Sequence, residues 1–502
     1  MTYSLLFSHP LLATSVGILL VGVIIHLYTS AKEKKVLGVP HLQFDGDNSP
    51  ERYIRETKSL LHAGYEKYTK HGLPFTMRNP VDPDLPLVIM PWTHLDEVKN
   101  APVSKLSFPL FSNQAFMLEY SHGPQQTKAS ALIVKRDLNK HLEDLLPGIQ
   151  DSCRKALASR MPECKEWTPF QPYMTFAYAV SKIFARTLLC TELADNEEWV
   201  NMNISTTMMT QKAAQDIRAK YTPRWRWLAR WRDPGAIAVF ANRKRAAELV
   251  APILKQRQDS DAVPMRRTDG IQWLLDVAGR KGKRPVELAD EELFLSIASI
   301  HSTTASILSI LYDLTDRPNA SQEIMAEVEE VRSRLEGGRW TKATLMQLGK
   351  LDSFMRESQR AHPLGCITVQ RSAVKPYTFK NGLHLPKDTH LAFPNIELNH
   401  DETIYEDAAS FRPWRFLDLR NRDDPSKFHF TYVSEKSINF GAGTHACPGR
   451  FFASVEIKLA LIHILTNYDV KWPKGGSRPS NMSHDFADLP NFMVDMMFRQ
   501  KT

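Results

Sequence analysis

The sequence predicts one large, mainly helical domain with a minor β part, placed behind an N-terminal membrane helix. Three observations support this fold class. An almost unbroken apolar run covers residues 11–28, and helix-type spacing of apolar residues recurs in the middle of the chain, as over 320–335. Residues 368–393 instead combine alternating apolar residues with turn signals such as Asn381-Gly382, which predicts short strands and hairpins. Because no repeat, Ser/Gly-rich linker or change in composition interrupts the remainder, we expect a single domain over residues 33–502.

Composition excludes some classes of protein and leaves others open. The 502 residues are 43% hydrophobic and carry 64 Lys and Arg against 56 Asp and Glu, a net charge of +8, which excludes an intrinsically disordered chain. Five cysteines without a CxxC pair argue against a disulfide scaffold or a zinc ribbon and favour a reducing compartment. The basic excess alone suits nucleic acid, anionic lipid or an acidic protein partner equally well.

The N-terminal apolar run is best explained by a membrane anchor. Residues 11–28 are about as long as a helix needs to cross the hydrocarbon of a bilayer. A secretory signal peptide is the alternative, but its basic residues would precede the apolar run, whereas here Lys32, Lys34 and Lys35 follow it. We therefore expect an anchor over residues 1–32 and, by the positive-inside rule, a cytosolic domain after it.

A long helix is predicted from Asp290 to Asp316. Acidic residues stand at its start, where the helix dipole favours them, and Pro318 follows its end. A second membrane span is the alternative, but the Ser, Thr and His residues inside the segment make it too polar for lipid. A stripe of small side chains lies on one face and consists of Ala298, Ser302, Ala305 and Ser309. Such a stripe lets a broad, flat group lie close to the helix.

The segment from Phe440 to Gly449, FGAGTHACPG, carries the strongest chemical signal. A helical pattern follows, which places Cys447 just before a helix N-terminus with Pro448 at the first helical position. The positive end of the helix favours a thiolate there, and the glycines let the backbone approach a flat ligand. The alternative is a buried cysteine in a glycine-rich turn, but the combined pattern F-x-x-G-x-x-x-C-x-G argues against it. The segment suits a thiolate ligand to haem iron.

With this motif the sequence resembles the cytochrome P-450 superfamily of haem-thiolate monooxygenases. Glu357 and Arg360 match the family's E-x-x-R motif, and Arg415 in the segment FRPWRF matches a second family arginine. In the family these three residues form a buried ion network that supports the cysteine loop. The resemblance therefore implies the cytochrome P-450 fold, with haem b as cofactor and Cys447 as the axial ligand of its iron.

Further cofactor-binding residues follow from the same resemblance. Arg371 matches the strand arginine that pairs with a haem propionate, and a surface arginine is the alternative. His445 stands where many members have an arginine, and it can donate a hydrogen bond to a propionate. The remaining matches in the cysteine loop are Phe440, Gly443 and Gly449. The helical Trp and Arg of many members have no clear counterpart, and Lys135 and Arg136 are weak candidates.

The long helix departs from the family at the position of oxygen activation. Members place an acid and a threonine there, where this chain has Ser302 and Thr303. The resemblance assigns oxygen activation to Thr303, but the acid is absent. Ser302, a chain of water molecules or His301 are alternative sources of the proton. The alternative for His301 is that it packs in the interface between helices and takes no part in proton delivery.

The resemblance implies a monooxygenase that inserts one atom of O2 into a lipophilic small molecule. Electrons would come from a separate NADPH-cytochrome P-450 reductase, with cytochrome b5 as a second donor, at the endoplasmic reticulum membrane. Some segments resemble fungal secondary-metabolite members, including ent-kaurene oxidases and indole-diterpene oxygenases, and favour a terpenoid substrate. A haem-thiolate isomerase, dehydratase or peroxide-using enzyme is the alternative, and a non-enzymatic haem-binding membrane protein is a further one.

Two basic clusters suggest partner surfaces. A surface near Cys447 with a basic character would suit an acidic reductase, and its candidate residues are Lys135, Arg136, Lys140 and Arg450. Residues 223–232, PRWRWLARWR, combine Arg with Trp. This combination is compatible with stacking on nucleic acid, with a membrane interface, or with Trp227 and Trp231 packed inward. The anchor favours the membrane, and we expect no nucleic-acid partner.

Overall fold

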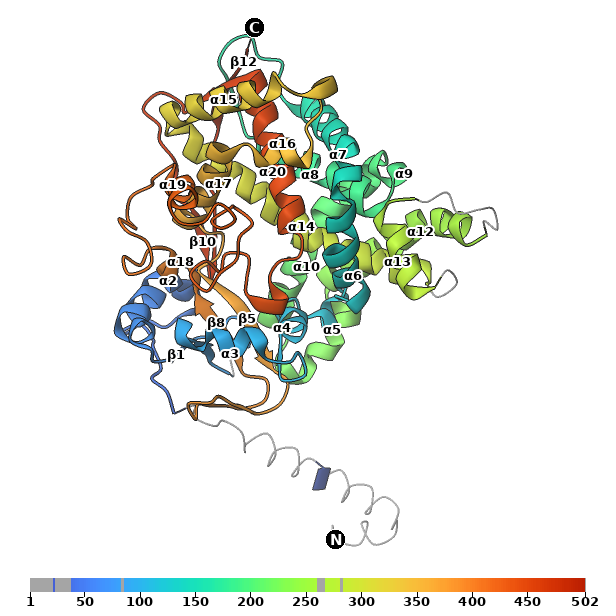
Figure 1. Ribbon diagram of the computed structural model, residues 1–502. Helices are drawn as coiled ribbons and strands as arrows, with labels where there is room; N and C mark the ends of the chain where they lie inside the picture. Colours follow the sequence, from blue (N-terminus) through green and yellow to red (C-terminus); the bar gives the residue numbers. More distant parts are fainter. Residues whose placement is uncertain (1–20, 23–37, 83–84, 260–266, 280–282, 502) are drawn as a thin grey trace, which may run out of the picture.

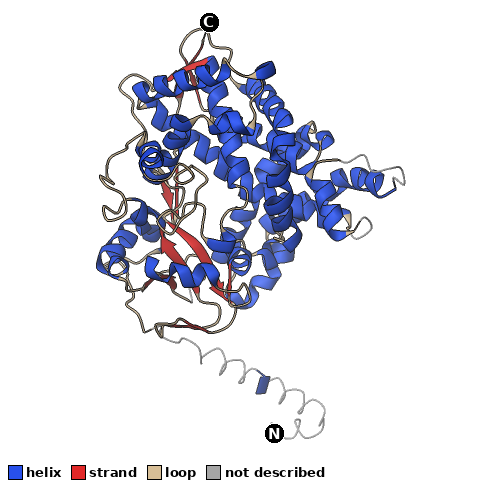
Figure 2. Cartoon of the chain, viewed as in Figure 1, coloured by secondary structure: helices blue, strands red, loops and turns tan. Residues whose placement is uncertain are grey.

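The computed structural model describes residues 21–22, 38–82, 85–259, 267–279 and 283–501. Within these residues the chain is mainly helical with a small β part, as the sequence predicts (Figure 2). The expected transmembrane helix over residues 11–28 lies outside the described residues, apart from Val21 and Gly22.

One long helix, α14 (Pro285–Thr315), crosses the helical part of the molecule (Figure 1). It begins five residues before the predicted start at Asp290. Pro285 occupies its first turn, and the Glu287 carboxylate accepts hydrogen bonds from the backbone and side chain of Arg284 at the start of the helix. The helix is long and apolar enough to cross a membrane, but most of its apolar stretch is buried inside the domain.

The helices packed against α14 come from both halves of the chain. They are α6 (Lys128–Ile133), α8 (Tyr173–Phe184), α10 (Glu197–Lys220), α12 (Pro234–Asp259), α15 (Pro318–Arg332), α17 (Gly349–Ala361) and α20 (Arg450–Asn467). The π-helical turn Val134–Leu138 joins α6 to α7 (Asn139–Arg160). The remaining helices are α2 (Pro50–Lys67), α3 (Leu95–Asn100), α4 (Phe108–Ala115), α5 (Leu118–Ser121), α9 (Thr191–Ala194), α11 (Ala229–Arg232), α13 (Gly270–Ala278), α16 (Lys342–Met346), α18 (Asn395–Asn399) and α19 (Arg415–Arg422).

The β part lies beside the helical part, and its largest sheet among the described residues has five strands (Figure 2). Its order is β1 (Phe75–Met77), β2 (Leu87–Ile89), β8 (His390–Pro394), β5 (Ile367–Ala373) and β3 (Leu106–Ser107). The smaller sheets contain β4 (Thr168–Phe170), β6 (Tyr377–Thr378), β7 (His384–Leu385), β9 (Tyr468–Lys471), β10 (Met482–His484), β11 (Ala487–Leu489) and β12 (Met496–Gln500). The strands expected within 368–393 are confirmed as β5 to β8, and Gly382 turns β6 into β7 with a φ of 89°.

Candidate functional site

Cys447 lies in a closed loop between the 3-10 turn Gly443–His445 and α20. Its N–H donates to the carbonyl oxygen of Phe440 at 2.7 Å, which closes the loop on itself. The helix begins at Arg450 with Gly449 as its cap. The prediction that Pro448 occupies the first helical position is therefore wrong, because Pro448 precedes the helix.

Two opposing effects determine the pKa of the Cys447 thiol. The N–H groups of Gly449 and Arg450 and the charge of the Arg450 guanidinium favour the thiolate, but burial outweighs them and raises the pKa above its ordinary value. The expected influence of the helix N-terminus is therefore present and is smaller than the cost of burying the charge. A cation bound to the sulfur, such as haem iron, would favour the thiolate in this loop.

The glycines of the loop are required by close packing as well as by access for a ligand. Gly443 has a φ of 63°, and a Cβ there would lie 2.6 Å from the carbonyl oxygen of Lys99 on α3. Gly441 also has a positive φ, of 76°. Arg450 braces the far side, since its guanidinium donates to the carbonyl oxygens of Thr431 and Cys447. The shape of the loop thus depends on contacts with α3 and with the chain before it.

A β-bulge in β5 decides which way Arg371 points. Thr368 pairs with Phe393 and Arg371 with Leu391, so three steps along β5 match two along β8. Opposite residues of an antiparallel pair share a face, so Thr368 and Arg371 lie on the same face. Val369, inside the bulge, has a φ of 53°, which is rare for a β-branched residue.

That face of the sheet belongs to the core that holds the cysteine loop. Leu391 and Phe393 cluster with Ile438 and Ala442, which precede Cys447. Without the extra residue in the bulge, Arg371 would lie on the opposite face. The bulge therefore brings Arg371 to the cysteine side of the sheet.

Arg371 is a buried cation that forms no ion pair with the residues that the structure describes. It is 2% exposed, and one N–H donates to the carbonyl oxygen of Gln370 at 2.8 Å. Its Nε and Nη2 find no acceptor among the residues that the structure describes, and burial lowers its pKa to about 10. Such a guanidinium fits a carboxylate supplied by a ligand, as a haem propionate would be.

His445 lies near two cations, Arg371 and Lys135. Burial and the positive charges of Arg371 and Lys135 all lower the pKa of His445, so its imidazole is neutral near pH 7. Lys135 therefore belongs to this group, although the sequence offered it only weakly. Arg136 is instead paired with Asp137, at 2.8 Å.

The three residues of the E-x-x-R network meet in the interior. Glu357 is fully buried, and its oxygens accept from Arg360 at 2.8 and 2.9 Å and from Arg415 at 3.1 and 3.2 Å. The N–H of Arg412 also donates to it, at 2.8 Å. The other N–H groups of the two guanidinium groups donate to the carbonyl oxygens of Asn399, Glu406, Asp407, Ala408 and Ser410. One carboxylate thus ties α17 to the segment that leads into α19.

Sequence reasoning missed a second buried network beside the first. Asp352, 4% exposed, accepts from Lys458 at 2.9 Å, from Arg420 at 3.0 Å and from the N–H of Phe430 at 3.0 Å. The surrounding cations hold the pKa of this carboxyl far below its usual range although burial opposes them. A lysine in the middle of the apolar helix after Cys447 was the signal that could have indicated it.

The open face of α14 includes only part of the expected stripe of small side chains, because Ala305 and Ser309 are buried. Ala298 and Ser302 are exposed along a helix that is otherwise largely buried, whereas Thr303 is only 3% exposed. The Ser302 hydroxyl donates to the carbonyl oxygen of Ala298 at 3.0 Å. Adjacent residues of a helix point about 100° apart, so the two hydroxyls have different surroundings. The structure places Ser302 on the open face and Thr303 inside.

Both ring nitrogens of His301 are engaged in contacts between helices. Nε2 lies 2.8 Å from the carbonyl oxygen of Ile204 on α10, and Nδ1 lies 2.7 Å from the hydroxyl of Tyr173 on α8. Because a carbonyl only accepts, Nε2 carries the proton and Nδ1 accepts from Tyr173. Burial lowers the pKa of His301, which keeps it neutral. His301 joins three helices, in agreement with the packing alternative.

Comparison with known proteins completes the description. The family model described as Cytochrome P450 matches residues 99–491. The chain is 53% identical to Cytochrome P450 monooxygenase cheE of Chaetomium globosum, over 92% of this chain and 91% of that protein. It is 41% identical to Cytochrome P450 monooxygenase ccsG of Aspergillus clavatus (92% and 93%) and 38% identical to Pyrichalasin C-7 hydroxylase of Pyricularia grisea (92% of each). The chain therefore belongs to the cytochrome P450 family, to its fungal secondary-metabolite type, and is a monooxygenase whose cofactor is haem bound through a cysteine thiolate.

Proposed function

We propose that this monooxygenase hydroxylates a lipophilic secondary metabolite at haem held by Cys447. One observation supports the assignment of the site. The closed loop of Cys447 and the buried guanidinium of Arg371 lie on one side of the five-stranded sheet. This side therefore offers both a sulfur ligand for iron and a cation for a carboxylate. The bound haem would supply the oxygen chemistry, for which a thiolate ligand favours cleavage of the O–O bond.

The surrounding residues bind and orient the cofactor. Cys447 would hold the iron, and Arg371 and the neutral imidazole of His445 would pair with the propionates. Phe440, Gly443 and Gly449 shape the loop that presents the sulfur. The Glu357, Arg360 and Arg415 network has a structural role, because it lies in the interior and satisfies its own charges.

Ser302 is the hydroxyl that the geometry favours for proton delivery. Its side chain is exposed on α14, and its hydroxyl donates a hydrogen bond to a carbonyl oxygen of the same helix. The hydroxyl can rotate away from this acceptor. Thr303, which the family resemblance favoured, is buried and would support the helix from within. Because the nitrogens of His301 are engaged by α8 and α10, this residue holds the helix in place and is not the proton source.

The relatives support hydroxylation more directly than they support one substrate class. One relative is named as a C-7 hydroxylase of pyrichalasin. For this chain we propose a terpenoid or a compound related to pyrichalasin as the two classes to test. Electrons would come from NADPH-cytochrome P450 reductase, with cytochrome b5 as an additional donor. Of the four basic candidates for the docking surface, Arg450 is tied to the cysteine loop and Arg136 to Asp137, which leaves Lys135 and Lys140.

Feeding candidate substrates to a host that expresses the chain tests this function. With a co-expressed reductase, we expect a product that contains one additional oxygen atom, detected by mass spectrometry. The host without reductase and the Cys447→Ala variant are the controls. A product of unchanged mass, or one that lacks the elements of water, formed without reductase would establish an isomerase or dehydratase instead. Turnover supported by peroxide alone would establish a peroxide-using enzyme.

The Trp and Arg cluster supports membrane association. Trp225, Trp227 and Trp231 are 53%, 50% and 64% exposed, which excludes the inward packing of Trp227 and Trp231. Ile237 and Phe240 at the start of α12 are also about half exposed. Tryptophan beside arginine is typical of surfaces that lie in the headgroup region of a bilayer. We propose that this patch, together with the N-terminal anchor, attaches the enzyme to the endoplasmic reticulum membrane.

A further inference from the structure

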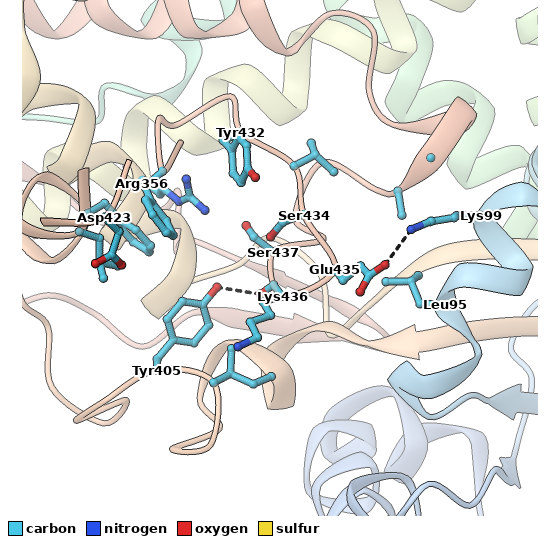
Figure 3. A pocket seen from close by; sticks show the side chains of 17 residues that line it. Leu95, Lys99, Arg356, Tyr405, Asp423, Tyr432, Ser434, Glu435, Lys436 and Ser437 are labelled. Atoms are coloured by element: carbon cyan, nitrogen blue, oxygen red, sulfur yellow. Dashed lines mark hydrogen bonds and ion pairs between the residues drawn. The ribbon is translucent and has the colours of Figure 1, made fainter. Parts of the chain in front are cut away.

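A cavity of about 680 Å³ lies behind the cysteine loop, on a side where no substrate function is assigned (Figure 3). Residues from α3, α17 and α19 and from the loop 423–437 line it, and Ala442 and Gly443 close it toward the cysteine. Cys447, Arg371 and Ser302 are not among the residues that line it. The cavity is therefore distinct from the open face of α14.

Arg356 forms one wall of this cavity and carries a buried charge. The residue is 4% exposed, and its guanidinium lies 4.3 Å from the ring centre of Phe416 and 5.6 Å from that of Tyr432. One N–H donates to the carbonyl oxygen of His429 at 2.8 Å. In Figure 3 the guanidinium points into the cavity from the side opposite Lys99.

Arg356 has no counter-ion within the described parts of the chain, where no carboxylate approaches it to ion-pair distance. Burial lowers its pKa to about 10, because desolvation outweighs the opposing effect of the more distant Asp352 carboxylate. The carboxylate of its neighbour Glu357 forms ion pairs with Arg360 and Arg415. The carboxylate of Asp352 forms ion pairs with Lys458 and Arg420. The aromatic rings and the His429 carbonyl offset part of the cost of burying Arg356, but no ion pair with a described residue does.

The two acidic residues that line the cavity are already paired. Asp423 lies 2.6 Å from Arg422, and Glu435 lies 2.9 Å from Lys99. Lys436 adds a cation at the rim. The rest of the wall is mostly apolar and includes Leu95, Ile404, Leu419, Phe428 and Val433. The cavity thus combines a buried cation, which has no ion pair with a described residue, with a largely apolar lining.

We propose that this cavity binds a small organic anion, a carboxylate or phosphate monoester with an apolar body, that pairs with Arg356. Cavities of about 300–1,000 Å³ are the usual size for small-molecule sites, and a single acidic side chain of a partner protein would fill only a fraction of this one. A bound ligand would touch Ala442 and Gly443 and so lie directly behind the loop of Cys447. This inference does not depend on the substrate of the monooxygenase.

Titration calorimetry on the full-length holoprotein tests the site with three matched probes. These are 1-naphthoate, 1-naphthyl phosphate and the neutral 1-naphthylmethanol. Excess imidazole is present throughout, so that the iron is ligated and binding beside the haem is blocked. We expect at least one anion to bind roughly 10–100 times more tightly than the alcohol, because hydrogen bonds to charged groups contribute about 1.5–3 kcal/mol. The two anions distinguish a carboxylate ligand from a phosphate ligand.

Three variants locate the binding. Arg356→Gln should abolish the preference for the anion, and Val433→Trp should block binding by filling the cavity while Arg356 stays in place. Lys427→Gln removes an exposed cation on the same loop that does not line the cavity, and it should bind like the wild type. The absorbance of the reduced carbon monoxide complex verifies that each variant is folded. Absence of binding by both anions, equal binding by the alcohol, an anion preference retained in Arg356→Gln, or unchanged binding in Val433→Trp would overturn the proposal.

Discussion

Lys458, on the helix that follows Cys447, places its ammonium group 2.9 Å from the carboxylate of Asp352 on α17. Arg420 of α19 reaches the same carboxylate at 3.0 Å. Since α17 also carries Glu357, the helix holds two buried carboxylates whose partners lie in different segments around the cysteine loop. The loop is therefore supported by charge pairs from α17, α19 and α20.

Asp352→Asn should destabilise the holoprotein strongly. The change leaves Lys458 and Arg420 buried without a counter-ion, which costs about 3–5 kcal/mol. Urea unfolding followed by the haem absorbance measures the loss. The control is Glu323→Gln, whose ion pair with Lys350 is exposed and should change stability by less than about 1 kcal/mol. Equal effects of the two substitutions would contradict the structural role of Asp352.

The contribution of Asp352 should also follow pH in one direction. Its pKa is held below the ordinary value in the folded protein, so the unfolded chain takes up the proton first as pH falls. The stabilisation is complete above the unfolded pKa of about 3.9 and is lost below it. The stability difference between the wild type and Asp352→Asn should therefore be constant at neutral pH and shrink in acid. A difference that grew on acidification would contradict this sign.

Cys447→Ser should remove the spectroscopic signature of thiolate ligation. The hydroxyl of serine has a much higher pKa than a thiol and cannot supply the same ligand to iron. We expect the reduced carbon monoxide complex of the variant to lack the thiolate-type absorbance, with the helical circular dichroism unchanged. Cys153→Ser, in the buried core, is the control and should keep the signature. A thiolate-type spectrum in Cys447→Ser would assign the ligand to another residue.

Arg371→Met should have opposite effects in the presence and absence of haem. Without haem, Arg371 is a buried cation that lacks a counter-ion, so an apolar side chain of similar length should leave stability unchanged or increase it. With haem, the variant loses the partner for a propionate and should release the cofactor faster to apomyoglobin. Loss of stability in the apoprotein, or unchanged haem release, would contradict the assignment.

The two hydroxyl residues of α14 should separate in a pair of variants. Ser302→Ala should waste more of the consumed NADPH as hydrogen peroxide, because the hydroxyl on the open face is lost. Thr303→Val keeps the shape of a buried side chain and should leave this ratio near the wild-type value. The measurement is product formed per NADPH consumed with a saturating reductase. If Thr303→Val alone uncouples the reaction, the assignment from family resemblance is restored.

Local motifs made much of this site predictable from the sequence, and tertiary packing explains what was not. The Cys447 loop and the residues of the E-x-x-R network carry their own spacing, so they could be located without a structure. The choice between Ser302 and Thr303 depends on the rotation of α14 about its axis, which a one-residue shift in a motif changes by about 100°. The pKa of Cys447 depends on burial, which a helix N-terminus does not reveal. The contact of Asp352 with Lys458 joins distant segments, so no local pattern contains it.

The patch of exposed tryptophans should lie in the headgroup region when the full-length protein is reconstituted in vesicles of anionic phospholipid. Lipids brominated near the headgroup should quench tryptophan fluorescence, and Trp227→Phe with Trp231→Phe should remove much of the quenched signal, because both rings are at least half exposed beside arginines. Trp414→Phe, at the start of α19, is the control and should leave the quenched fraction unchanged. Quenching by single-stranded oligonucleotides in place of brominated lipid would favour the nucleic-acid alternative.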